Sequence, residues 1–435
     1  MGDLLESHPT DAVTAVENAV ASIRAGRMIV VVDDEDRENE GDLVMAAQAV
    51  TPEAVNFMAQ HARGLTCVSL PAERLDELDL PPMVSNNTSS FETGFAVSVD
   101  VAGEGRTGIS AADRAATIQA LCDPNTRPAD LVRPGHMFPL RAKPHGVLQR
   151  SGHTEAAADL ARLAGFQPYG VLCEIMSQDG SMARRGELED FSRKHGLDLV
   201  TVDDIVKYRQ ATEPLIECVA ETRMPTLYGE FRAYGFKPIW EDRTSYLALV
   251  MGEVAGCDAI QVRLHSECVT GDVFASSRCD CGRQLHAAME RIATDGRGIV
   301  LYAIGHEGRG IGLLEKIRAY ALQDDGLDTV DANVALGFPP DARDYGLAAQ
   351  ALTWLGAQNI RLLTNNPDKV AALKRHGINV RERIALTPRA ADESVPYLRT
   401  KRDRLGHVLD SLETADRLLG MRPECTKAAA MRGAR

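Results

Sequence analysis

Three cysteines in the second half of the sequence have the spacing of metal ligands. Cys279 lies eleven residues after Cys268, and Cys281 follows two residues later. In a reducing compartment, closely spaced thiols are metal ligands rather than disulfides. No fourth ligand stands at an obvious spacing, and three thiolates with one open position are typical of a catalytic zinc that also binds water. The alternative is three unrelated buried cysteines.

An acidic segment in the first half is a second candidate metal site. The ten residues from Asp33 to Asp42 include seven carboxylates, which repel one another unless a cation or solvent relieves them. Apolar runs at 28–32 and 43–47 predict buried strands on either side, so the segment lies at the end of a sheet, where sites are often built. Hard oxygen ligands suit magnesium or manganese. A solvated turn is the alternative.

Three further segments of the first half carry groups for phosphate binding and proton transfer. Arg150–Glu155 precedes a helix: Gly152 allows close backbone approach, Thr154 can cap the helix, and a helix N-terminus favours phosphate. The segment 133–136 (Arg-Pro-Gly-His) places a second histidine in a loop. Glu174 ends an apolar strand at 171–175, where partial burial raises the pKa of a carboxyl and suits it to acid–base work.

Together these segments resemble 3,4-dihydroxy-2-butanone 4-phosphate synthase over about residues 10–209. That family converts ribulose 5-phosphate to a four-carbon phosphate plus formate, with Mg²⁺ or Mn²⁺. The resemblance implies that Glu38 and His153 bind the metal, that His136 and Glu174 transfer protons, and that Cys67 is an active-site cysteine. The residues implied to contact the sugar phosphate are Arg37, Glu38, Asp42, Arg150, Ser151, Gly152, His153, Thr154 and Glu174. Two departures from the family are Arg106 and the segment 86–95.

In the second half, a Gly-rich stretch and scattered cations point to a phosphate ligand. Glu307–Gly312 precedes a helix, although a Gly-rich loop alone is a weak signal. Arg263, Arg343 and Lys369 add the local positive charge that a triphosphate needs in an acidic protein.

With the cysteine motif H-S-E-C-x-T-G-D and C-D-C-G, this half resembles GTP cyclohydrolase II over about residues 221–407. That family opens the imidazole ring of GTP and releases formate and pyrophosphate. The resemblance implies zinc on Cys268, Cys279 and Cys281. It also makes Asp341 a proton acceptor, Arg343 a nucleophile and Tyr320 a participant in ring opening. The residues implied to contact GTP are Arg263, Leu264, His265, Ser266, Glu267, Gln284, Glu307, Gly308, Arg309, Thr329, Thr364 and Lys369.

The role of Arg343 stays open at this point. A guanidinium is charged under ordinary conditions, so charge stabilisation at the α-phosphate is an alternative to nucleophilic attack. A surface arginine paired with Asp341 or Asp344 is another alternative. The segment 303–306 also departs from the family, because relatives often carry an arginine there.

The elements that position these groups fall into two sets. In the first half we expect helices at 11–25, 111–121, 156–164 and 205–209, and strands at 28–32, 43–47 and 95–101. The pattern restarts after 210–214 with strands at 247–251, 259–264, 299–304 and 360–364 and helices at 284–294, 313–323 and 346–355. The sequence therefore predicts two α+β or α/β domains, 1–211 and 212–435, each a mixed sheet covered by helices, with a loose tail at 422–435.

Composition limits the classes of function. A net charge of −14 and a pI near 5.3 argue against nucleic-acid binding, which needs a basic face. No apolar run approaches the roughly 20 residues of a membrane span, and Met1–Ser7 lacks the features of an export signal, so we expect a cytoplasmic protein. Relatives of both halves form dimers, which implies a homodimer. The alternatives are a chain with one active half, a paralogue serving a specialised pathway, and a zinc-containing regulator of nucleic acid.

Overall fold

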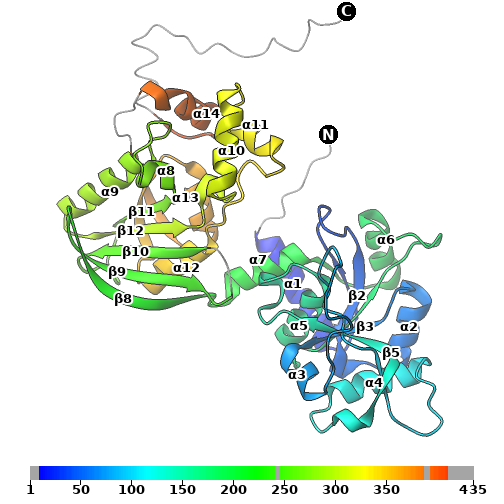
Figure 1. Ribbon diagram of the computed structural model, residues 1–435. Coiled ribbons are helices and arrows are strands. Elements are labelled where there is room, and N and C mark those ends of the chain that lie inside the picture. Colours follow the sequence, from blue (N-terminus) through cyan, green and yellow to red (C-terminus); the bar gives the residue numbers. More distant parts are fainter. Residues whose placement is uncertain (1–8, 241–243, 387–391, 410–435) are drawn as a thin grey trace, which may run out of the picture. The chain divides into compact units, whose positions relative to one another are not determined.

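A computed structural model describes residues 9–240, 244–386 and 392–409 (Figure 1). The chain divides into two compact units, Met1–Glu213 and Pro214–Arg435. The segment Met1–Ser7 and the expected tail at 422–435 lie outside the described residues. Among the described helices, none combines the length and the apolar character that a membrane span requires.

The first unit is built on a mixed sheet of seven strands. Two neighbouring pairs, β3 with β5 and β1 with β7, are parallel, and the other neighbours are antiparallel. The strands, in spatial order, are β4 (Val99–Val101), β5 (Leu131–Ala142), β3 (Cys67–Pro71), β6 (Gly170–Glu174), β2 (Gly41–Ala46), β1 (Ile29–Val32) and β7 (Leu199–Thr201).

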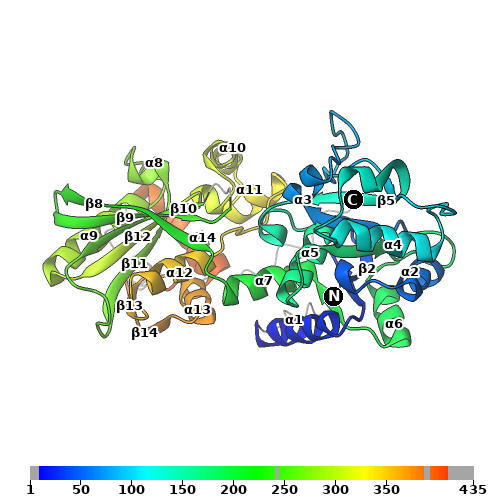
Figure 2. The same cartoon turned by 90° about the horizontal axis from the view of Figure 1, so that it is seen from below.

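Helices cover both faces of this sheet (Figure 2). The helices on one face are α1 (Pro9–Arg24), α5 (His153–Leu163) and α7 (Val202–Thr212). The helices on the other face are α2 (Pro52–Phe57), α3 (Ala72–Glu77), α4 (Ala111–Cys122) and α6 (Arg185–His195). Because strand side chains alternate between faces, β1 and β2 contribute to both apolar cores: Val30 packs with the second set and Val31 with the first.

The second unit also has a mixed seven-stranded sheet. Its neighbours β14, β13, β11 and β12 run parallel, and β10, β9 and β8 continue the sheet in antiparallel fashion. The strands, in spatial order, are β14 (Asn379–Ile384), β13 (Asn359–Leu363), β11 (Ile260–Ser266), β12 (Gly298–Ile304), β10 (Ser245–Met251), β9 (Gly229–Pro238) and β8 (Ile216–Thr226).

In this second unit, helices again lie on both faces, and others gather past the strand ends. Helix α9 (Cys281–Asp295) packs on one face with Phe231, while α12 (Gly346–Trp354) packs on the other, where Trp354 contacts Phe236. Helix α13 (Pro367–Arg375) lies beside α12. The helices past the carboxyl ends of β11 and β12 are α8 (Val269–Asp272), α10 (Leu313–Asp324), α11 (Thr329–Ala335) and α14 (Val395–Leu405) (Figure 1).

The predicted fold class, two mixed sheets each covered by helices, is confirmed. Three local predictions are wrong. The segment 133–136 lies in strand β5 rather than in a loop, and only residues 99–101 of the expected strand at 95–101 form β4. Helix α5 begins at His153, so Thr154 is its second residue and Gly152 is the N-cap. The hairpin of β8 and β9 was not predicted, because charged side chains interrupt the alternation along β8.

A buried ion cluster holds the end of α7 against the segment that precedes Arg150. Arg209 Nη1 lies 2.7 Å from Asp159 Oδ2 and donates to the carbonyl of His145 at 2.8 Å, and its other nitrogens bond Glu213. Asp159 Oδ2 also accepts from the N–H of Val147. Arg209 is 4% exposed, so its charge is balanced by protein groups and not by water.

We expect Arg209→Met to lower the stability of the first unit by about 3 kcal/mol, because it removes the nearest ion-pair partner of the buried Asp159 carboxylate and leaves only Arg162 at 3.8 Å. Chemical denaturation followed by far-ultraviolet circular dichroism measures this change. Tryptophan fluorescence separates the units, since both tryptophans, Trp240 and Trp354, belong to the second.

The matched control is Arg193→Met, because the pair of Arg193 with Asp190 is exposed and should be worth less than about 1 kcal/mol. Equal effects of the two substitutions would show that the buried cluster does not support the fold.

Candidate active sites

Asp33 organises the acidic loop between β1 and β2. Its Oδ1 accepts a hydrogen bond from the N–H of Glu40 (2.8 Å), and its Oδ2 accepts from the N–H of Glu38 (3.1 Å) and from Arg37 Nη1 (2.8 Å). Arg37 Nη2 in turn lies 3.1 Å from Glu38 Oε1. A fully buried carboxylate with three donors folds the loop back on itself and fixes Arg37 and Glu38 next to each other.

A group of possible ligand atoms lies at this loop. Atoms of Asp33, Glu38 and His153 are all within 4.8 Å of one another. His153 Nδ1 lies 3.6 Å from Glu38 Oε2 and 4.0 Å from Asp42 Oδ1. Within the described chain, Asp42 Oδ1 and His153 Nε2 are buried without a hydrogen-bond partner.

The titratable groups around His153 shift one another's pKa values. Burial raises the pKa of Asp42 to about 7. Burial by itself lowers the pKa of His153, but the Asp42 and Glu38 carboxylates raise it to about 9. Carboxylates gathered around one imidazole, with buried polar atoms left unpaired, fit a site for a divalent cation.

The pairing of β2 with β6 sets Asp42 beside Glu174. These residues are directly opposed in the antiparallel register, so their side chains lie on the same face of the sheet. Glu174 Oε2 accepts a hydrogen bond from the N–H of Leu65 (2.8 Å), and a Cβ on Gly64 would lie 2.7 Å from that oxygen. A glycine at 64 therefore leaves room for a carboxylate held next to the candidate cation site.

Two arginines converge on Gly152 at the N-terminus of α5. A Cβ at this position would lie 2.5 Å from Arg150 Nη1 and 2.9 Å from Arg37 Nη2. Arg150 Nη1 is fixed by the buried Glu155, whose Oε2 lies at 2.6 Å. Two guanidinium groups beside the open N–H groups of a helix N-terminus form an anion site that suits phosphate.

The unusual segment 86–95 packs directly on these arginines. Arg37 Cζ lies 5.2 Å from the centroid of the Phe91 ring. Arg150 Nη2 donates to the carbonyl of Phe91 (3.0 Å) and to Thr93 Oγ1 (3.2 Å). The departure from the family pattern therefore lies at the phosphate site and not at the candidate metal ligands.

Two residues predicted for this site are not among the possible metal-ligand atoms, although Cys67 lies near Glu174 and Asp42. The His136 ring is paired with Asp100, Nδ1 to Oδ2 at 2.7 Å, and in the described chain no hydrogen bond or ion pair links it to Glu38 or His153. Cys67 is buried in β3, and burial raises the pKa of its thiol well above the ordinary range. Cys67 is therefore a neutral thiol in this arrangement.

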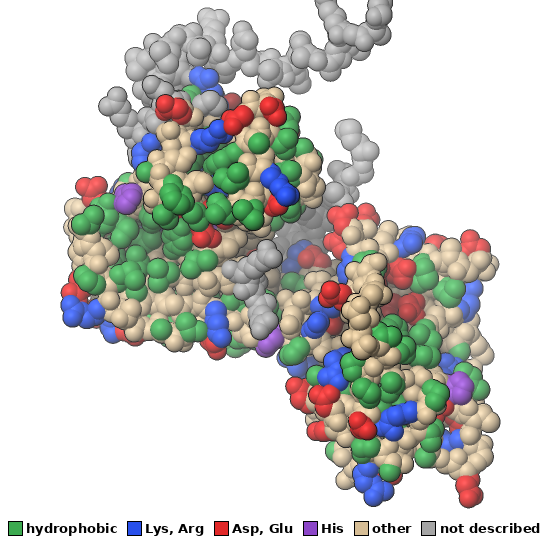
Figure 3. All heavy atoms as spheres, in the orientation of Figure 1, with side chains coloured by type: hydrophobic (Ala, Val, Ile, Leu, Met, Phe, Trp, Pro, Cys, Tyr) green, Lys and Arg blue, Asp and Glu red, His purple; other side chains and the backbone are tan. Residues whose placement is uncertain are grey.

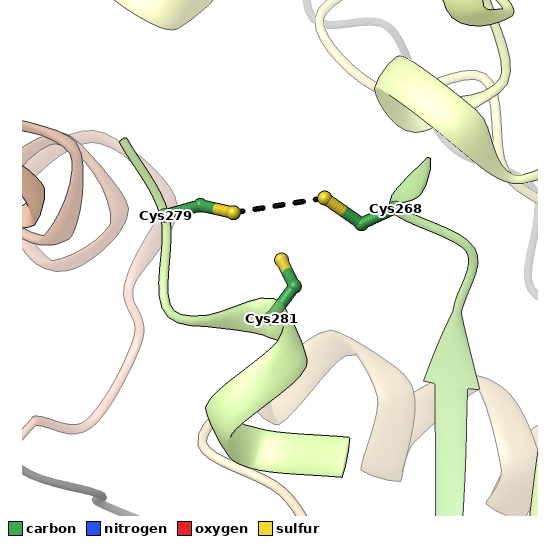
Figure 4. A group of neighbouring side chains, drawn as sticks. All are labelled: Cys268, Cys279 and Cys281. Carbon is green, nitrogen blue, oxygen red and sulfur yellow. Dashed lines mark hydrogen bonds between the residues drawn. The ribbon is translucent and has the colours of Figure 1, made fainter. Parts of the chain in front are cut away.

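The three cysteines of the second unit point their sulfurs toward one another (Figure 4). Cys268 follows β11 and Cys281 begins α9; the Sγ atoms of Cys268 and Cys279 are 3.6 Å apart, and all three sulfurs are within 4.8 Å. Gly271 allows this approach, because a Cβ there would lie 2.8 Å from Cys279 Sγ. Hydrogen bonds from Cys279 and Cys281, and the charge of Lys316, hold the pKa of the Cys268 thiol well below its ordinary range.

Lys316 of α10 contacts the same group. Its Nζ lies 3.1 Å from Cys268 Sγ and 3.0 Å from Thr270 Oγ1, and it forms an ion pair with Glu307. Glu307 is fixed by the N–H of Val269 at 2.6 Å. Three sulfur donors, one of them a preformed thiolate, with no fourth cysteine or histidine ligand grouped with them in the described residues, fit a zinc ion with an open coordination position.

Cations line the same pocket beyond the cysteines. They include Arg263, Arg309, Arg343 and Lys369. Arg263 Nη1 and Lys369 Nζ donate to the carbonyls of Leu363 and Leu264, both at 3.0 Å. Burial, with the charges of Arg263 and Arg343, lowers the pKa of Lys369 well below its ordinary range. Clustered buried cations of this kind suit a polyanionic ligand.

Arg343 is both paired and turned into the pocket. Its Nε lies 2.8 Å from Asp341 Oδ1, and its Nη1 donates to Ser266 Oγ at 3.2 Å. Burial opposes the charge, but Tyr345 and Asp341 raise the pKa of the Arg343 guanidinium further above its ordinary value. The alternative of a surface arginine is wrong, because Arg343 does pair with Asp341 but its side chain is largely buried and lines the pocket.

Most residues predicted for the nucleotide line this one pocket. They are Arg263, His265, Ser266, Glu267, Gln284, Glu307, Gly308, Arg309, Tyr320, Thr329, Arg343, Thr364 and Lys369. Leu264 is different, because its side chain is buried in the sheet and only its carbonyl faces a site residue, Lys369. Asp341 does not line the pocket, but it forms an ion pair with Arg343, which does.

Several supporting residues were missed. Asp272 accepts hydrogen bonds from the N–H of Cys268 (3.0 Å) and the hydroxyl of Tyr302 (2.8 Å), and His306 is buried in the lining. Asp272 was visible within the cysteine motif, whereas Lys316 had no local signal. Other missed lining residues include Tyr397, Lys401 and His407.

Comparisons with known proteins match each unit to one family. Residues 17–208 match the family of 3,4-dihydroxy-2-butanone 4-phosphate synthase, and residues 217–385 match GTP cyclohydrolase II. The riboflavin biosynthesis protein RibBA of Salinispora arenicola is 55% identical over 405 residues, which cover 93% of this chain and 96% of that protein. The RibBA protein of Salinispora tropica is 56% identical over 394 residues, or 91% and 98% of the two chains.

A similar crystal structure is that of RibBX from A. baumannii, described as a two-domain 3,4-dihydroxy-2-butanone 4-phosphate synthase. It is 39% identical, covers 86% of this chain and 99% of its own, and has a TM-score of 0.63. The likeness therefore extends over both units of the present chain.

We expect Gly152→Ala to weaken the binding of ribulose 5-phosphate about 10-fold, because the new methyl group displaces the two arginines and costs one good phosphate contact. Isothermal titration without divalent metal measures binding in the absence of turnover. Gly186→Ala is the control, since a Cβ there meets nothing within 4 Å. Unchanged affinity in the Gly152 variant would rule out the phosphate site at α5.

Proposed function

The chain belongs to the family of bifunctional riboflavin biosynthesis proteins, and we propose that each of its units carries one complete active site. It is a lyase that forms 3,4-dihydroxy-2-butanone 4-phosphate and formate from ribulose 5-phosphate, and a hydrolase that opens GTP with release of formate and pyrophosphate. We assign the synthase to residues 1–213 and the cyclohydrolase to 214–435. The observation that carries this assignment is that each unit has its own group of three converging metal-ligand side chains.

In the synthase site we propose Mg²⁺ or Mn²⁺ held by Glu38 and His153, with Asp33 close enough to complete the group. The bound cation would polarise the vicinal oxygens of the sugar, which makes the neighbouring C–H bonds acidic. Arg37 and Arg150 bind the phosphate at the start of α5, with the main chain of residues 151–154. This fixes the sugar with its carbonyl end toward Asp42 and Glu174.

We assign proton transfer in this site to side chains that hydrogen bonds hold in place and that remain accessible. The Glu174 carboxylate is held by the N–H of Leu65 beside the cation site and takes the first proton. His136 is 45% exposed, and Asp100 fixes its ring, which suits a second proton-transfer group. Cys67 stays a neutral thiol, so we assign it to packing against the substrate and not to nucleophilic attack.

In the cyclohydrolase site we propose Zn²⁺ on Cys268, Cys279 and Cys281. Zinc would supply Lewis-acid chemistry at C8 of guanine. The chain itself binds the triphosphate through Arg263, Arg309, Arg343 and Lys369, whose positive charges cluster in the pocket. The Glu307 carboxylate is fixed by the main chain and by Lys316, so it is pre-oriented toward the ligand.

Arg343 stabilises charge on the α-phosphate in this proposal. Its pKa is raised and Asp341 remains ionised beside it, so a neutral, nucleophilic guanidine is costly to form. Asp341 orients Arg343 and is available to accept a proton during pyrophosphate release. The centroid of the Tyr320 ring lies 5.6 Å from Lys316 Nζ, and we assign Tyr320 to the ring-opening step.

We extend the proposal to a homodimer in the cytoplasm. Apolar side chains show at the surface of the second unit around α10 and α11 (Figure 3), among them Leu314 (78% exposed) and Ile317. A second copy is the simplest cover for such a surface. Zinc thiolates need a reducing compartment, which supports the cytoplasmic location.

We expect Glu38→Gln to reduce formate release from ribulose 5-phosphate by at least about 100-fold, because it removes a charged metal ligand. Formate release from GTP, assayed separately with the same preparation, should stay within about twofold. Glu35→Gln is the matched control, since Glu35 is an exposed carboxylate of the same loop. Loss of both activities in the Glu38 variant would contradict two independent sites.

Cys279→Ser should lose zinc and GTP opening and keep the synthase reaction. Elemental analysis of the purified, reduced protein should find one zinc per wild-type chain and far less in the variant. Cys257→Ser, which changes a cysteine outside the group, should keep its zinc. Full zinc and full GTP turnover in the Cys279 variant would overturn the metal assignment.

A further inference from the structure

The last described segment, Ser394–Leu409, lies beside the nucleotide pocket although it follows the matched cyclohydrolase range of 217–385. It consists of α14 with one residue before it and four after it. Tyr397, Lys401 and His407 line the pocket together with the cysteines and the cations. None of these three side chains has a role in the reaction described above.

Lys401 links the segment to the cysteine turn. Its Nζ lies 3.2 Å from Oδ1 of Asp280, the residue between Cys279 and Cys281, and 4.3 Å from the centroid of the Tyr397 ring. Only 11% of the Lys401 side chain is exposed, so this is a largely desolvated ion pair. An ammonium group has three donors, so a donor remains for a ligand beside the contacts of Lys401 with Asp280 and Tyr397.

A chain of buried hydrogen bonds continues from Asp280 into the sheet. The second carboxylate oxygen of Asp280 accepts from Gln284 Nε2, and Gln284 Oε1 accepts from Arg263 Nη2 at 2.7 Å. Arg263 is one of the cations assigned to the triphosphate. Lys401 is therefore connected through two residues to the phosphate-binding side of the pocket.

The ends of the segment are attached to two separate parts of the pocket wall. Before α14, Ser394 Oγ accepts from Arg283 Nη2 of α9 at 3.3 Å. After α14, the N–H of Val408 donates to the carbonyl of Asn365, in the turn that follows β13, at 3.0 Å. Gly406 (φ 63°) ends the helix and turns the chain toward this contact.

We propose that Ser394–Leu409 forms the wall that closes the GTP site and that Lys401 and Tyr397 bind the phosphate chain of the nucleotide. The inference rests on the proposed cyclohydrolase function of the second unit. Asp280 neutralises Lys401 while the pocket is without nucleotide, which allows a further cation beside Arg309, Arg343 and Lys369. A phosphate oxygen then takes the remaining donors of Lys401 and the Tyr397 hydroxyl.

The His407 side chain lines this wall as an uncharged group. Burial and the positive charges of Lys401 and Arg309 lower the pKa of His407 to about 3, so the imidazole is neutral near pH 7. The wall therefore adds one cation and two uncharged groups, and Lys401 is the residue whose removal tests it most directly.

The test uses the full chain and a GTP analogue with a methylene group between the α- and β-phosphorus atoms. Lys401→Met should weaken analogue binding at least about 10-fold, as expected for one lost charge-assisted hydrogen bond. It should raise KM for GTP similarly, and zinc content and synthase activity should not change. Lys401→Arg should recover most of the affinity. Lys374→Met, an exposed lysine of α13, is the matched control.

Hydrogen exchange gives a second readout that needs no variant. Amide exchange in residues 394–408 of the wild-type protein should be slower with the analogue bound than without it. The same comparison on zinc-free protein serves as the reference. Wild-type affinity of Lys401→Met, or unchanged exchange in 394–408 when analogue binds, would overturn the inference. Should Lys401→Met fail to fold, the exchange result decides alone. Failure of the wild type to open GTP would instead overturn the cyclohydrolase assignment.

Discussion

Buried charge that the chain does not balance is the constraint on which both sites depend. In the first unit, carboxylates surround His153 and leave polar atoms of Asp42 and His153 unpaired. In the second, arginines and lysines crowd one pocket beside three thiols. Taking an ion out of water costs several kcal/mol, so such groups stay together only where a ligand returns the missing charge. These arrangements suit the ligands proposed above: a cation in the first unit, and in the second a cation at the sulfurs and a polyanion at the arginines.

Main-chain N–H groups hold the acidic residues of both sites in place. Asp33, Glu174, Glu307 and Asp272 each accept at least one hydrogen bond from a peptide N–H. A peptide group cannot turn as a side chain does, so the carboxylates are fixed before any ligand arrives. The sheets position these carboxylates. In the first unit, the β2–β6 register aligns Asp42 with Glu174. In the second, the parallel strands β11, β12 and β13 end at the same edge of the sheet, where the loops that carry the site residues begin.

Sequence reasoning identified both metal groups, because their ligands lie in short runs with distinctive spacing. It also anticipated the strands with unbroken apolar runs, such as β1, β2, β11 and β12, but it missed β3, β5, β7, β8, β9 and β14. It missed residues that reach a site from far along the chain, since spacing carries no information about them: Lys316 and Lys401 arrive from α10 and α14. It placed His136 in a loop because proline and glycine precede it, yet strand β5 accommodates both next to the short β4. The helix cap at Gly152 was misjudged because α5 begins without a capping side-chain hydrogen bond, so no capping residue marks its start in the sequence.

The closeness of the cysteine sulfurs has a consequence for the life of the protein. Cys268 and Cys279 lie 3.6 Å apart at their sulfurs, and the first has a pKa that favours the thiolate, the form that attacks during disulfide formation. Without a metal, a two-electron oxidation would therefore join these two sulfurs in a disulfide across the proposed cyclohydrolase centre. The proposed zinc would shield the thiols from this reaction as well as supply Lewis-acid chemistry.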